Sequence, residues 1–271
     1  MVVPDVPYAV RAHPPGRVSH GLQSARDDAG IVLLTLDRPR ARNALDDELT
    51  DALATALDGA AHDPLTRAVI LTGAGDAFCA GGDLARFEQE WTPSAFRRHS
   101  HRLTAMIAAI ERLEKPVIAA INGAVAGAGT QLALACDVRV AAPATRFIFR
   151  EGRLGIIPSH GGVARLVKLV GLARARDVLL GSEEVGAAEA HRLGLITAVA
   201  VDVVDEAHNR ALLALRRSPE AYAAAKRLLA IAADAPLDAA MAAEALAQTS
   251  LIATSEHREA VLRAREKRER G

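Results

Sequence analysis

Apolar residues in this chain fall into two patterns, short uninterrupted runs and longer stretches with helical spacing. The uninterrupted runs, at residues 31–36, 68–71, 117–121 and 138–141, predict buried strands. Residues 93–112 instead place apolar side chains on one helix face, and Lys115-Pro116 ends that pattern just before the next strand. Because strands and helices alternate, the pattern predicts an α/β fold with parallel strands joined by crossover helices.

Further helices complete the chain. One covers residues 45–60, with Asn43 as its candidate N-cap, and another begins at about Thr130. Three short helices, at residues 161–170, 174–181 and 187–193, precede a last strand at residues 196–201. After that strand only helical spacing remains, over residues 204–217, 219–232, 237–253 and 255–270.

The same patterns divide the chain into three parts. Residues 1–21 contain four prolines and two glycines without periodicity, and we expect them to form a flexible leader. Residues 22–203 hold the predicted strands, and residues 204–271 form an all-helical C-terminal region. That region has an apolar stripe, which packs either within the subunit or against another subunit: Leu237, Met241, Leu246 and Leu251.

Composition narrows the class of protein. The 271 residues carry 33 Lys and Arg against 33 Asp and Glu, so no net charge directs the chain to nucleic acid or a membrane surface. No apolar run is long enough to span a bilayer, and the proline-rich start lacks the apolar core of a signal peptide. Cys79 and Cys136 have neither disulfide-framework nor metal-ligand spacing, so we expect no metal, and a cytoplasmic enzyme fits best.

Two glycine-rich turns carry the candidate chemistry. Residues 71–84 (LTGAGDAFCAGGDL) and 121–137 (INGAVAGAGTQLALACD) each run from an apolar strand through glycines into an apolar helix. Such a turn leaves backbone N–H groups free at a helix N-terminus, and two turns brought together make an oxyanion hole. For either turn alone the alternative is structural, because tight turns before helices need glycine.

Together with residues 147–162 (FIFREGRLGIIPSHGG), these turns resemble three ordered motifs of the crotonase superfamily, the enoyl-CoA hydratase/isomerase proteins. The resemblance covers about residues 31–265. It implies a core of repeated ββα units in a spiral, and C-terminal helices at the interface of a homotrimer, with trimers often paired into hexamers. It also implies an enzyme acting on an acyl-CoA thioester, with no permanently bound cofactor and coenzyme A as part of the substrate.

The resemblance also assigns catalytic groups. The backbone N–H groups of Gly82 and Ala128 are the implied oxyanion donors, with alanine at a position that is often glycine in relatives. Glu151 matches one catalytic glutamate of the hydratases, whereas Gln131 stands where they carry a second. The Gln131 amide can orient water but accepts no proton, so a single carboxylate favours moving a double bond over adding water.

The segment around Glu151 leaves two questions open. If Glu151 faces an apolar acyl pocket, burial raises its pKa; the alternative is an exposed carboxylate paired with Arg150 or Arg153. Ser159 and His160 follow in the same motif, at a place where some relatives put a functional side chain. His160 is therefore a candidate second acid/base group, although a structural histidine in a turn is the commoner arrangement.

Other positions resemble the coenzyme A site of the family. Arg40, within RPRARNAL (38–45), is a candidate phosphate partner because guanidinium groups make paired bonds to phosphate; Lys267 or Arg268 is a second candidate. The remaining candidate contacts to the adenine and pantetheine portions are Ala44, Leu45, Ala80, Asp83, Leu84 and Ala85. Phe87, Trp91 and Phe96 follow the first turn, in a region that often walls the acyl pocket.

Several functions stay open on the sequence. Double-bond isomerisation is preferred, with hydration and other thioester chemistry (decarboxylation, hydrolysis, ring formation) as alternatives of the same class. A noncatalytic acyl-CoA-binding subunit is an alternative of another class, because Gln131 replaces a carboxylate. A Rossmann dinucleotide enzyme is excluded, since no GxGxxG follows an early strand with an acidic residue after the next one.

Overall fold

The computed structural model describes residues 17–86, 88 and 90–269. Its larger sheet is built from β1 (Arg17–Ser19), β2 (Leu22–Arg26), β3 (Ile31–Leu36), β4 (Ala68–Gly73), β6 (Val117–Ile121), β8 (Val138–Ala141) and β11 (Ala198–Val199). The strands lie in the order β1-β2-β3-β4-β6-β8-β11. Neighbours from β3 to β11 are parallel, whereas the β1-β2 and β2-β3 pairs are antiparallel.

A smaller sheet contains short strands that the apolar pattern does not reveal. These are β5 (Ala77–Cys79), β7 (Ala124–Ala126), β9 (Arg146–Ile148) and β10 (Glu184–Gly186), in the order β10-β9-β7-β5. Pairs β5-β7 and β7-β9 are parallel, and β9-β10 is antiparallel. At three residues each, these strands are too short to show a period of their own.

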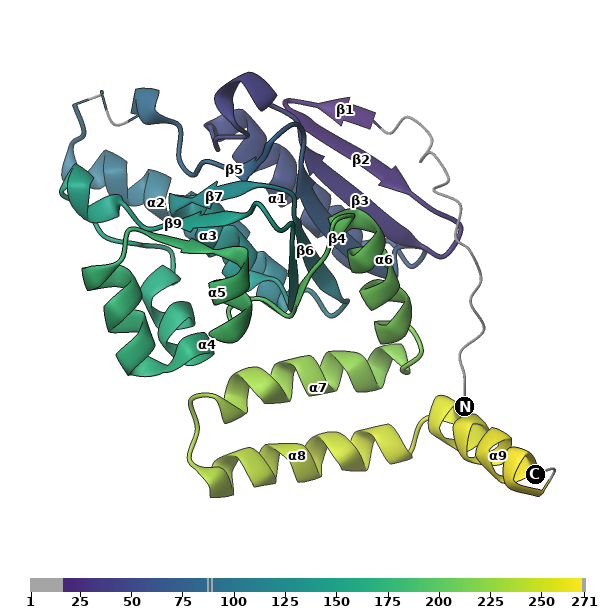
Figure 1. The fold of residues 1–271 in the computed structure, drawn as a ribbon. Helices are drawn as coiled ribbons and strands as arrows, with labels where there is room; N and C mark the ends of the chain where they lie inside the picture. Colours follow the sequence, from purple (N-terminus) through teal and green to yellow (C-terminus); the bar gives the residue numbers. More distant parts are fainter. Residues whose placement is uncertain (1–16, 87, 89, 270–271) are drawn as a thin grey trace.

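The chain repeats one unit, in which a strand of the larger sheet is followed by a strand of the smaller sheet and then by a helix. The described α-helices are α1 (Asp47–His62), α2 (Pro93–Arg112), α3 (Gly127–Ala135), α4 (Gly162–Arg176), α5 (Ala187–Arg192), α6 (Val203–Ala214), α7 (Pro219–Ala232), α8 (Leu237–Ile252) and α9 (Ser255–Glu269). Units β4-β5-α2, β6-β7-α3 and β8-β9-α4 each contribute one strand to each sheet and then a helix (Figure 1). The expected ββα spiral is therefore the observed architecture.

The uninterrupted apolar runs are strands buried on both faces. In β4, Val69 and Leu71 belong to the core under α1 and α2, while Ile70 belongs to a second core on the other face. Side chains alternate between faces along a strand, so both sets must be apolar when both faces are covered. This burial explains why the sequence located β3, β4, β6 and β8 so closely.

Helix α6 packs on the larger sheet, whereas the predicted division between residues 203 and 204 places it in the C-terminal region. Its residues Val203, Ala207 and Ala211 are buried against Ile70 and Ile118 of the larger sheet. The predicted division was placed where the strand pattern of the sequence ends. A helix that follows the last strand can still pack on the sheet, and α6 does so.

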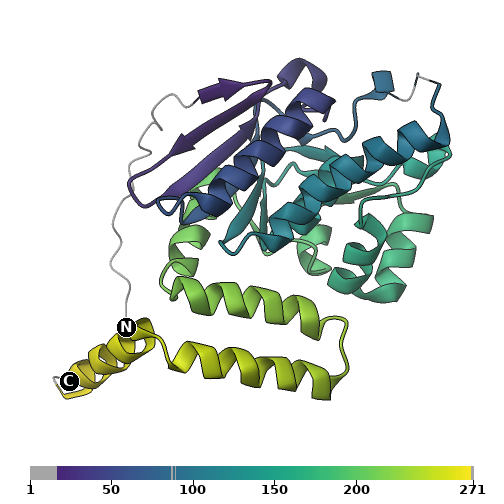
Figure 2. The same ribbon diagram turned by 180° about the vertical axis from the view of Figure 1, so that it is seen from behind.

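Helix α7 is tied to the spiral, because the Lys226 ammonium donates to the Ile110 carbonyl at 3.0 Å and to the Asp137 carboxylate at 2.8 Å. Both views show α8 beside α7 and α9 beyond them (Figures 1 and 2). Most of the predicted apolar stripe is exposed: Leu237 to 74%, Met241 to 55% and Leu246 to 74%. Met241 and Leu251 line a groove between α7 and α8. Packing within the subunit therefore involves two residues of the stripe, whereas Leu237 and Leu246 remain exposed.

Two local expectations are wrong. The leader was predicted to reach residue 21, but Arg17–Ser19 forms β1 and pairs with β2; residues 1–16 lie outside the described part. The N-cap of α1 is Asp46, whose side chain accepts a hydrogen bond from the Leu49 N–H, and not Asn43. Asn43 is buried, and its side chain ties the loop before α1 to the first glycine-rich turn.

Among the described helices, none combines the length and apolar character needed to cross a bilayer.

Close packing of α3 on β5 leads to a stability prediction. A Cβ added at Gly129 would lie 2.4 Å from the Cys79 carbonyl oxygen, so Gly129→Ala must push α3 away from β5. We expect a loss of roughly 1–3 kcal/mol in the free energy of unfolding, measured by chemical denaturation. Gly59→Ala in α1 is the matched control, because an added Cβ there meets nothing within 4 Å. Equal stability of the two variants would contradict this packing.

Candidate active site

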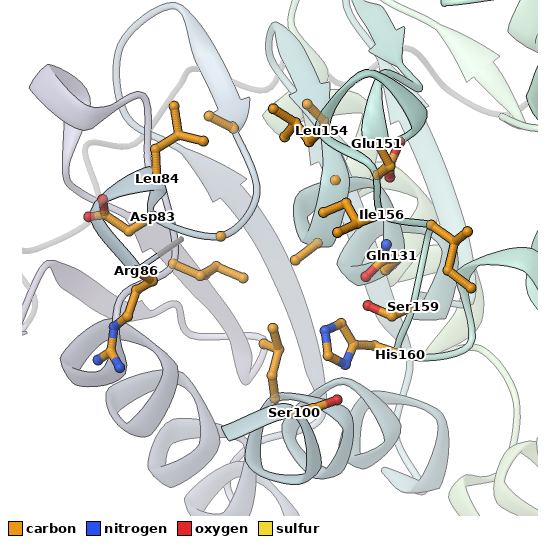
Figure 3. Close-up of a pocket in the computed structure, with 18 of the residues that line it drawn as sticks. Asp83, Leu84, Arg86, Ser100, Gln131, Glu151, Leu154, Ile156, Ser159 and His160 are labelled. Atoms are coloured by element: carbon orange, nitrogen blue, oxygen red, sulfur yellow. The ribbon is translucent and has the colours of Figure 1, made fainter. Parts of the chain in front are cut away.

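A cavity of about 610 Å³ opens between α2, the first glycine-rich turn and the segment after β9 (Figure 3). All three motifs singled out in the sequence contribute to its lining, through Gly82, Ala128, Gln131, Glu151 and His160 among others. Its size is that of a site for a small organic ligand. The spiral therefore brings together groups that lie far apart in the sequence.

The first turn presents the N–H of Gly82 to this cavity. Leu45 bridges to Gly82 in the manner of a parallel strand: its N–H donates to the Gly81 carbonyl at 2.7 Å, and its carbonyl accepts from Asp83 at 3.1 Å. In such a bridge the peptide N–H of the central residue points to the opposite side. The Gly82 N–H therefore points away from Leu45 and remains available to a ligand.

The second turn lies directly against the first. Ala128 is in the first turn of α3, where backbone N–H groups have no partner within the helix. A Cβ built on Gly81 would lie 3.2 Å from the Ala128 nitrogen and 2.9 Å from the Ala126 carbonyl oxygen. Only glycine permits this approach, and the φ of +99° at Gly81 also favours glycine. Two N–H donors are thus held at one wall of the cavity.

Two residues that the sequence analysis did not assign to this role brace the first turn. Arg38 pairs with Asp46 at 3.0 Å and Asp83 at 3.2 Å. The Asn43 amide donates to the Ala77 carbonyl at 2.8 Å and to the Ala74 carbonyl at 2.9 Å. Because both side chains cross from the loop before α1, they hold the turn rigid, which a preorganised oxyanion hole requires.

Glu151 begins the short turn after β9, and its side chain points into the cavity (Figure 3). It is 8% exposed, so the alternative of an exposed carboxylate is wrong. Arg150 and Arg153 pair with Glu183 instead, at 3.4 Å and 2.5 Å, and no described residue forms an ion pair with Glu151. The carboxylate therefore remains available for proton transfer.

Burial raises the pKa of Glu151 above its ordinary 4.5, although its own backbone N–H favours the ionised form. A carboxyl whose pKa is higher in the folded than in the unfolded state destabilises the fold when it ionises. This destabilisation begins as the pH passes the unfolded-state pKa and is complete above the folded-state pKa. We therefore expect Glu151→Gln to have a higher Tm than wild type at neutral pH, with the difference vanishing in acid. Thermal denaturation across this pH range tests the prediction, and a lower Tm of the variant at neutral pH would contradict it.

Gln131 lies in the second turn of the apolar helix α3, beside the cavity (Figure 3). The residue is 3% exposed, and its Oε1 is buried without a hydrogen-bond partner among the described residues. A buried amide oxygen left unpaired is unfavourable by about 1–3 kcal/mol. The arrangement thus favours a ligand or water that donates a hydrogen bond here.

Ser159 and His160 also line the cavity, on the loop that leads into α4. The His160 ring is half-buried, and its Nδ1 lies 2.9 Å from the Thr104 hydroxyl of α2. Burial lowers the pKa of His160 to about 4, with contributions from the nearby His99 and Arg165. The imidazole is therefore neutral at physiological pH, and too weakly basic to remove a carbon-bound proton efficiently.

The candidate coenzyme A residues fall into two groups. Leu45, Ala80, Asp83 and Leu84 line the cavity, and their chain neighbours Ala44, which is buried, and Ala85, which is exposed, do not. Arg40 is exposed in the turn Pro39–Ala41 and is not among the lining residues. Lys267 belongs to α9, which lies apart from the spiral (Figure 1), and its side chain is outside the described part.

The predicted acyl-pocket wall is present in part. Trp91 and Phe96 line the cavity with ring centroids 5.7 Å apart, whereas Phe87 lies outside the described residues. The Trp91 indole N–H donates to the Arg86 carbonyl at 2.8 Å, which fixes its ring. Among the described side chains, no group of His, Cys, Asp and Glu is arranged to hold a metal ion.

Comparison with known proteins agrees with these features. The sequence profile of the family described as enoyl-CoA hydratase/isomerase matches residues 26–270. A probable enoyl-CoA hydratase of Rhodobacter capsulatus is 41% identical over 88% of this chain and 93% of its own length. A 2,3-dehydroadipyl-CoA hydratase of Escherichia coli is 36% identical over 85% of this chain and 90% of its own. A 1,2-epoxyphenylacetyl-CoA isomerase of Escherichia coli is 36% identical over 65% of this chain and 68% of its own.

Solved structures share the fold. The crystal structure of an enoyl-CoA hydratase from Bacillus anthracis superposes with a TM-score of 0.87 at 32% identity, covering 91% of this chain and 96% of that one. The resemblance based on three motifs is thereby confirmed: the protein is an enzyme with the crotonase fold. More specifically, the chain belongs to the enoyl-CoA hydratase/isomerase family, whose substrates are CoA thioesters.

Proposed function

We propose that this protein isomerises an enoyl-CoA thioester by moving its double bond from the 3 to the 2 position. One observation carries the proposal. The described cavity residues include two carboxylates, of which Asp83 pairs with Arg38 and only Glu151 has no ion-pair partner among the described residues. A reaction that needs a single proton carrier fits this site best.

The chemistry takes two steps. The Glu151 carboxylate removes a proton from the α-carbon, and the electrons of that C–H bond pass into the thioester as a dienolate. The N–H groups of Gly82 and Ala128 stabilise the negative oxygen, each donor contributing about 10²–10³ in rate. Glu151 then returns the same proton to the γ-carbon, which leaves the 2-enoyl thioester with unchanged composition. A raised pKa suits a group that acts first as base and then as acid.

Hydration is the second candidate. The unpaired Oε1 of Gln131 favours it, because a water held there would lie in the same cavity as Glu151. Several relatives are also named hydratases, among them those of Rhodobacter capsulatus and Escherichia coli. In this reaction Glu151 alone must both activate the water and supply the α-proton, since an amide takes no proton.

A paired turnover assay separates these functions. Wild type and Glu151→Ala receive a 3-enoyl-CoA and a 2-enoyl-CoA of matched length, and products are identified by mass and retention time. We expect a product of unchanged mass from the 3-enoyl thioester, lost in the variant. A product heavier by one water would show hydration instead. Binding of both thioesters without turnover would favour a noncatalytic acyl-CoA-binding subunit.

Coenzyme A is proposed as the carrier part of the substrate, with no separate cofactor. Leu45, Ala80, Asp83 and Leu84 support this assignment because they border the cavity. Arg40 is proposed as a phosphate partner, since it is exposed and pairs with none of the described carboxylates. The role of Lys267, like a location in the cytoplasm, stays a prediction.

We also propose a homotrimer or hexamer built through the C-terminal helices. The exposed apolar side chains of α7 and α8, including Leu229, Leu237 and Leu246, support it because such a surface is unfavourable in water. Light scattering of the purified protein should give a mass three or six times that of the 28.5 kDa chain. Leu237→Lys combined with Leu246→Lys should shift the mass to that of one chain. A wild-type monomer would contradict the proposal.

A further inference from the structure

The loop that carries His160 is held in an unusual backbone conformation. His160 has φ of 51° and Gly161 has φ of 84°, so two consecutive residues are left-handed. Few residues other than glycine adopt this region, although histidine does so more often than most. The isomerisation proposed above uses neither residue, so this geometry needs another explanation.

Arg165 of α4 fixes the loop from behind. Its guanidinium donates to the His160 carbonyl at 2.6 Å and makes two bonds to the Glu111 carboxylate, at 2.7 and 2.6 Å. Gly161 has a φ of +84°, a conformation that a residue with a Cβ would adopt only with strain, so glycine favours this arrangement. The backbone of His160 is therefore locked while its side chain faces the cavity.

Thr104 fixes the ring. Its hydroxyl donates to the Ser100 carbonyl at 2.8 Å, and the same oxygen lies 2.9 Å from His160 Nδ1. A hydroxyl has one hydrogen, and it is committed to a carbonyl that can only accept. This arrangement favours the tautomer in which Nδ1 carries the proton and donates a hydrogen bond to the Thr104 oxygen. In the neutral ring, Nε2 is then a hydrogen-bond acceptor without a proton.

His160 lies at the opposite end of the labelled wall from Glu151. Figure 3 shows Glu151 near Leu154 at one end of the labelled wall and His160 near Ser100 at the other, with Gln131 between them. The His160 ring points into the cavity. An acyl group whose α-carbon is at Glu151 would meet His160 farther along its chain.

The cavity presents no unpaired cation among the described residues. Of its lining arginines, Arg86 pairs with Asp47, and Arg150 and Arg153 pair with Glu183. A carboxylate at the far end of an acyl group would find no positive partner, and the Nε2 acceptor would repel it. A hydroxyl group, in contrast, can donate a hydrogen bond to the unprotonated Nε2 atom.

We propose that His160 is a specificity-determining residue, whose Nε2 accepts a hydrogen bond from a hydroxyl group carried by the acyl chain beyond its reacting carbons. The inference rests on the proposed function, because it takes an acyl-CoA thioester as the occupant of the cavity. The hydroxyl belongs to an aliphatic chain or to an aromatic ring, and the Trp91 and Phe96 side chains suit either.

Binding of unreactive, saturated acyl-CoA thioesters tests the proposal by calorimetry. Three thioesters of matched length end in hydroxyl, methyl and carboxylate, and a fourth carries a hydroxyphenyl group. We expect a hydroxyl-bearing thioester to bind roughly 3- to 10-fold more tightly than the methyl one. Comparison of the aliphatic hydroxyl thioester with the hydroxyphenyl thioester shows whether the site prefers an alcohol or a phenol. The preference should stay constant with pH above the His160 pKa of about 4.

Variants separate selection from a structural role. His160→Ala should abolish the hydroxyl preference, measured as the ratio of the hydroxyl to the methyl affinity within the variant. Thr104→Val keeps His160 in place but frees its ring, so the preference should weaken, and Thr104→Ser should restore it. His62→Ala is the control, because His62 is exposed at the end of α1, outside the cavity lining. If His160→Ala does not fold, the Thr104 pair carries the test.

Three results would overturn the proposal: equal affinities for hydroxyl and methyl thioesters in wild type, an unchanged preference in the variants, or tightest binding of the carboxylate. Failure of every thioester to bind would overturn the proposed function as well. Turnover of enoyl-CoA without a hydroxyl preference would overturn the role of His160 alone, so the two failures are distinguishable.

Discussion

Glu151→Gln is expected to lower kcat for isomerisation of a 3-enoyl-CoA by roughly 10²–10⁴-fold, the usual contribution of a general acid–base group. The amide has nearly the shape of the carboxylate but cannot accept the α-proton. Since Glu151 is buried and has no ion-pair partner among the described residues, its replacement breaks no salt bridge that holds the fold. Steady-state kinetics measured by product formation give the value directly.

The matched control is Glu183→Gln, at the residue just before β10. Glu183 pairs with Arg150 and Arg153 and is not a lining residue, so its loss should change kcat by less than the catalytic variant does. A Glu151→Gln enzyme that folds and retains most of its kcat would show that another group moves the proton.

Ala128→Pro is expected to lower kcat by roughly 10²–10³-fold, because it deletes one of the two N–H donors of the proposed oxyanion hole. Proline is tolerated in the first turn of a helix, where the N–H makes no bond within the helix. The loss should fall on kcat more than on KM, since negative charge on the thioester oxygen develops in the transition state. Kinetics with a 3-enoyl-CoA measure both constants.

Ala128→Gly separates the donor from the side chain. This variant keeps the N–H and removes only the methyl group, so it should retain most of the wild-type kcat. Similar losses in the proline and glycine variants would argue that packing around Ala128, and not the N–H group, supports the reaction.

The elements best predicted from the sequence are those with the strongest burial. The pattern located β3, β6, β8 and α2 at their observed bounds because both faces of those strands, and one face of that helix, are buried. The short strands β5, β7, β9 and β10 were missed, because three residues cannot show a period. Asn43 was misread as an N-cap, since its role depends on carbonyl groups more than thirty residues away along the chain.

The candidate site was predictable where backbone geometry dictates the residue. Glycine at positions 81 and 129 follows from close contacts between the two turns, and the motifs therefore appear in the sequence. The bracing role of Arg38 was not visible, because Asp46 and Asp83 become its partners only after folding. The 2.9 Å contact between His160 Nδ1 and the Thr104 hydroxyl was likewise not visible, because Thr104 belongs to a helix distant in sequence.

Proton exchange tests the central claim, that Glu151 moves a proton at a thioester enolate held by Gly82 and Ala128. A saturated acyl-CoA is incubated with enzyme in heavy water, and deuterium at its α-carbon is followed by mass spectrometry. Exchange by wild type, abolished in Glu151→Gln and strongly slowed in Ala128→Pro, is the predicted result. Exchange that persists in Glu151→Gln, or its absence in a wild-type protein that binds and converts enoyl-CoA, would contradict the account.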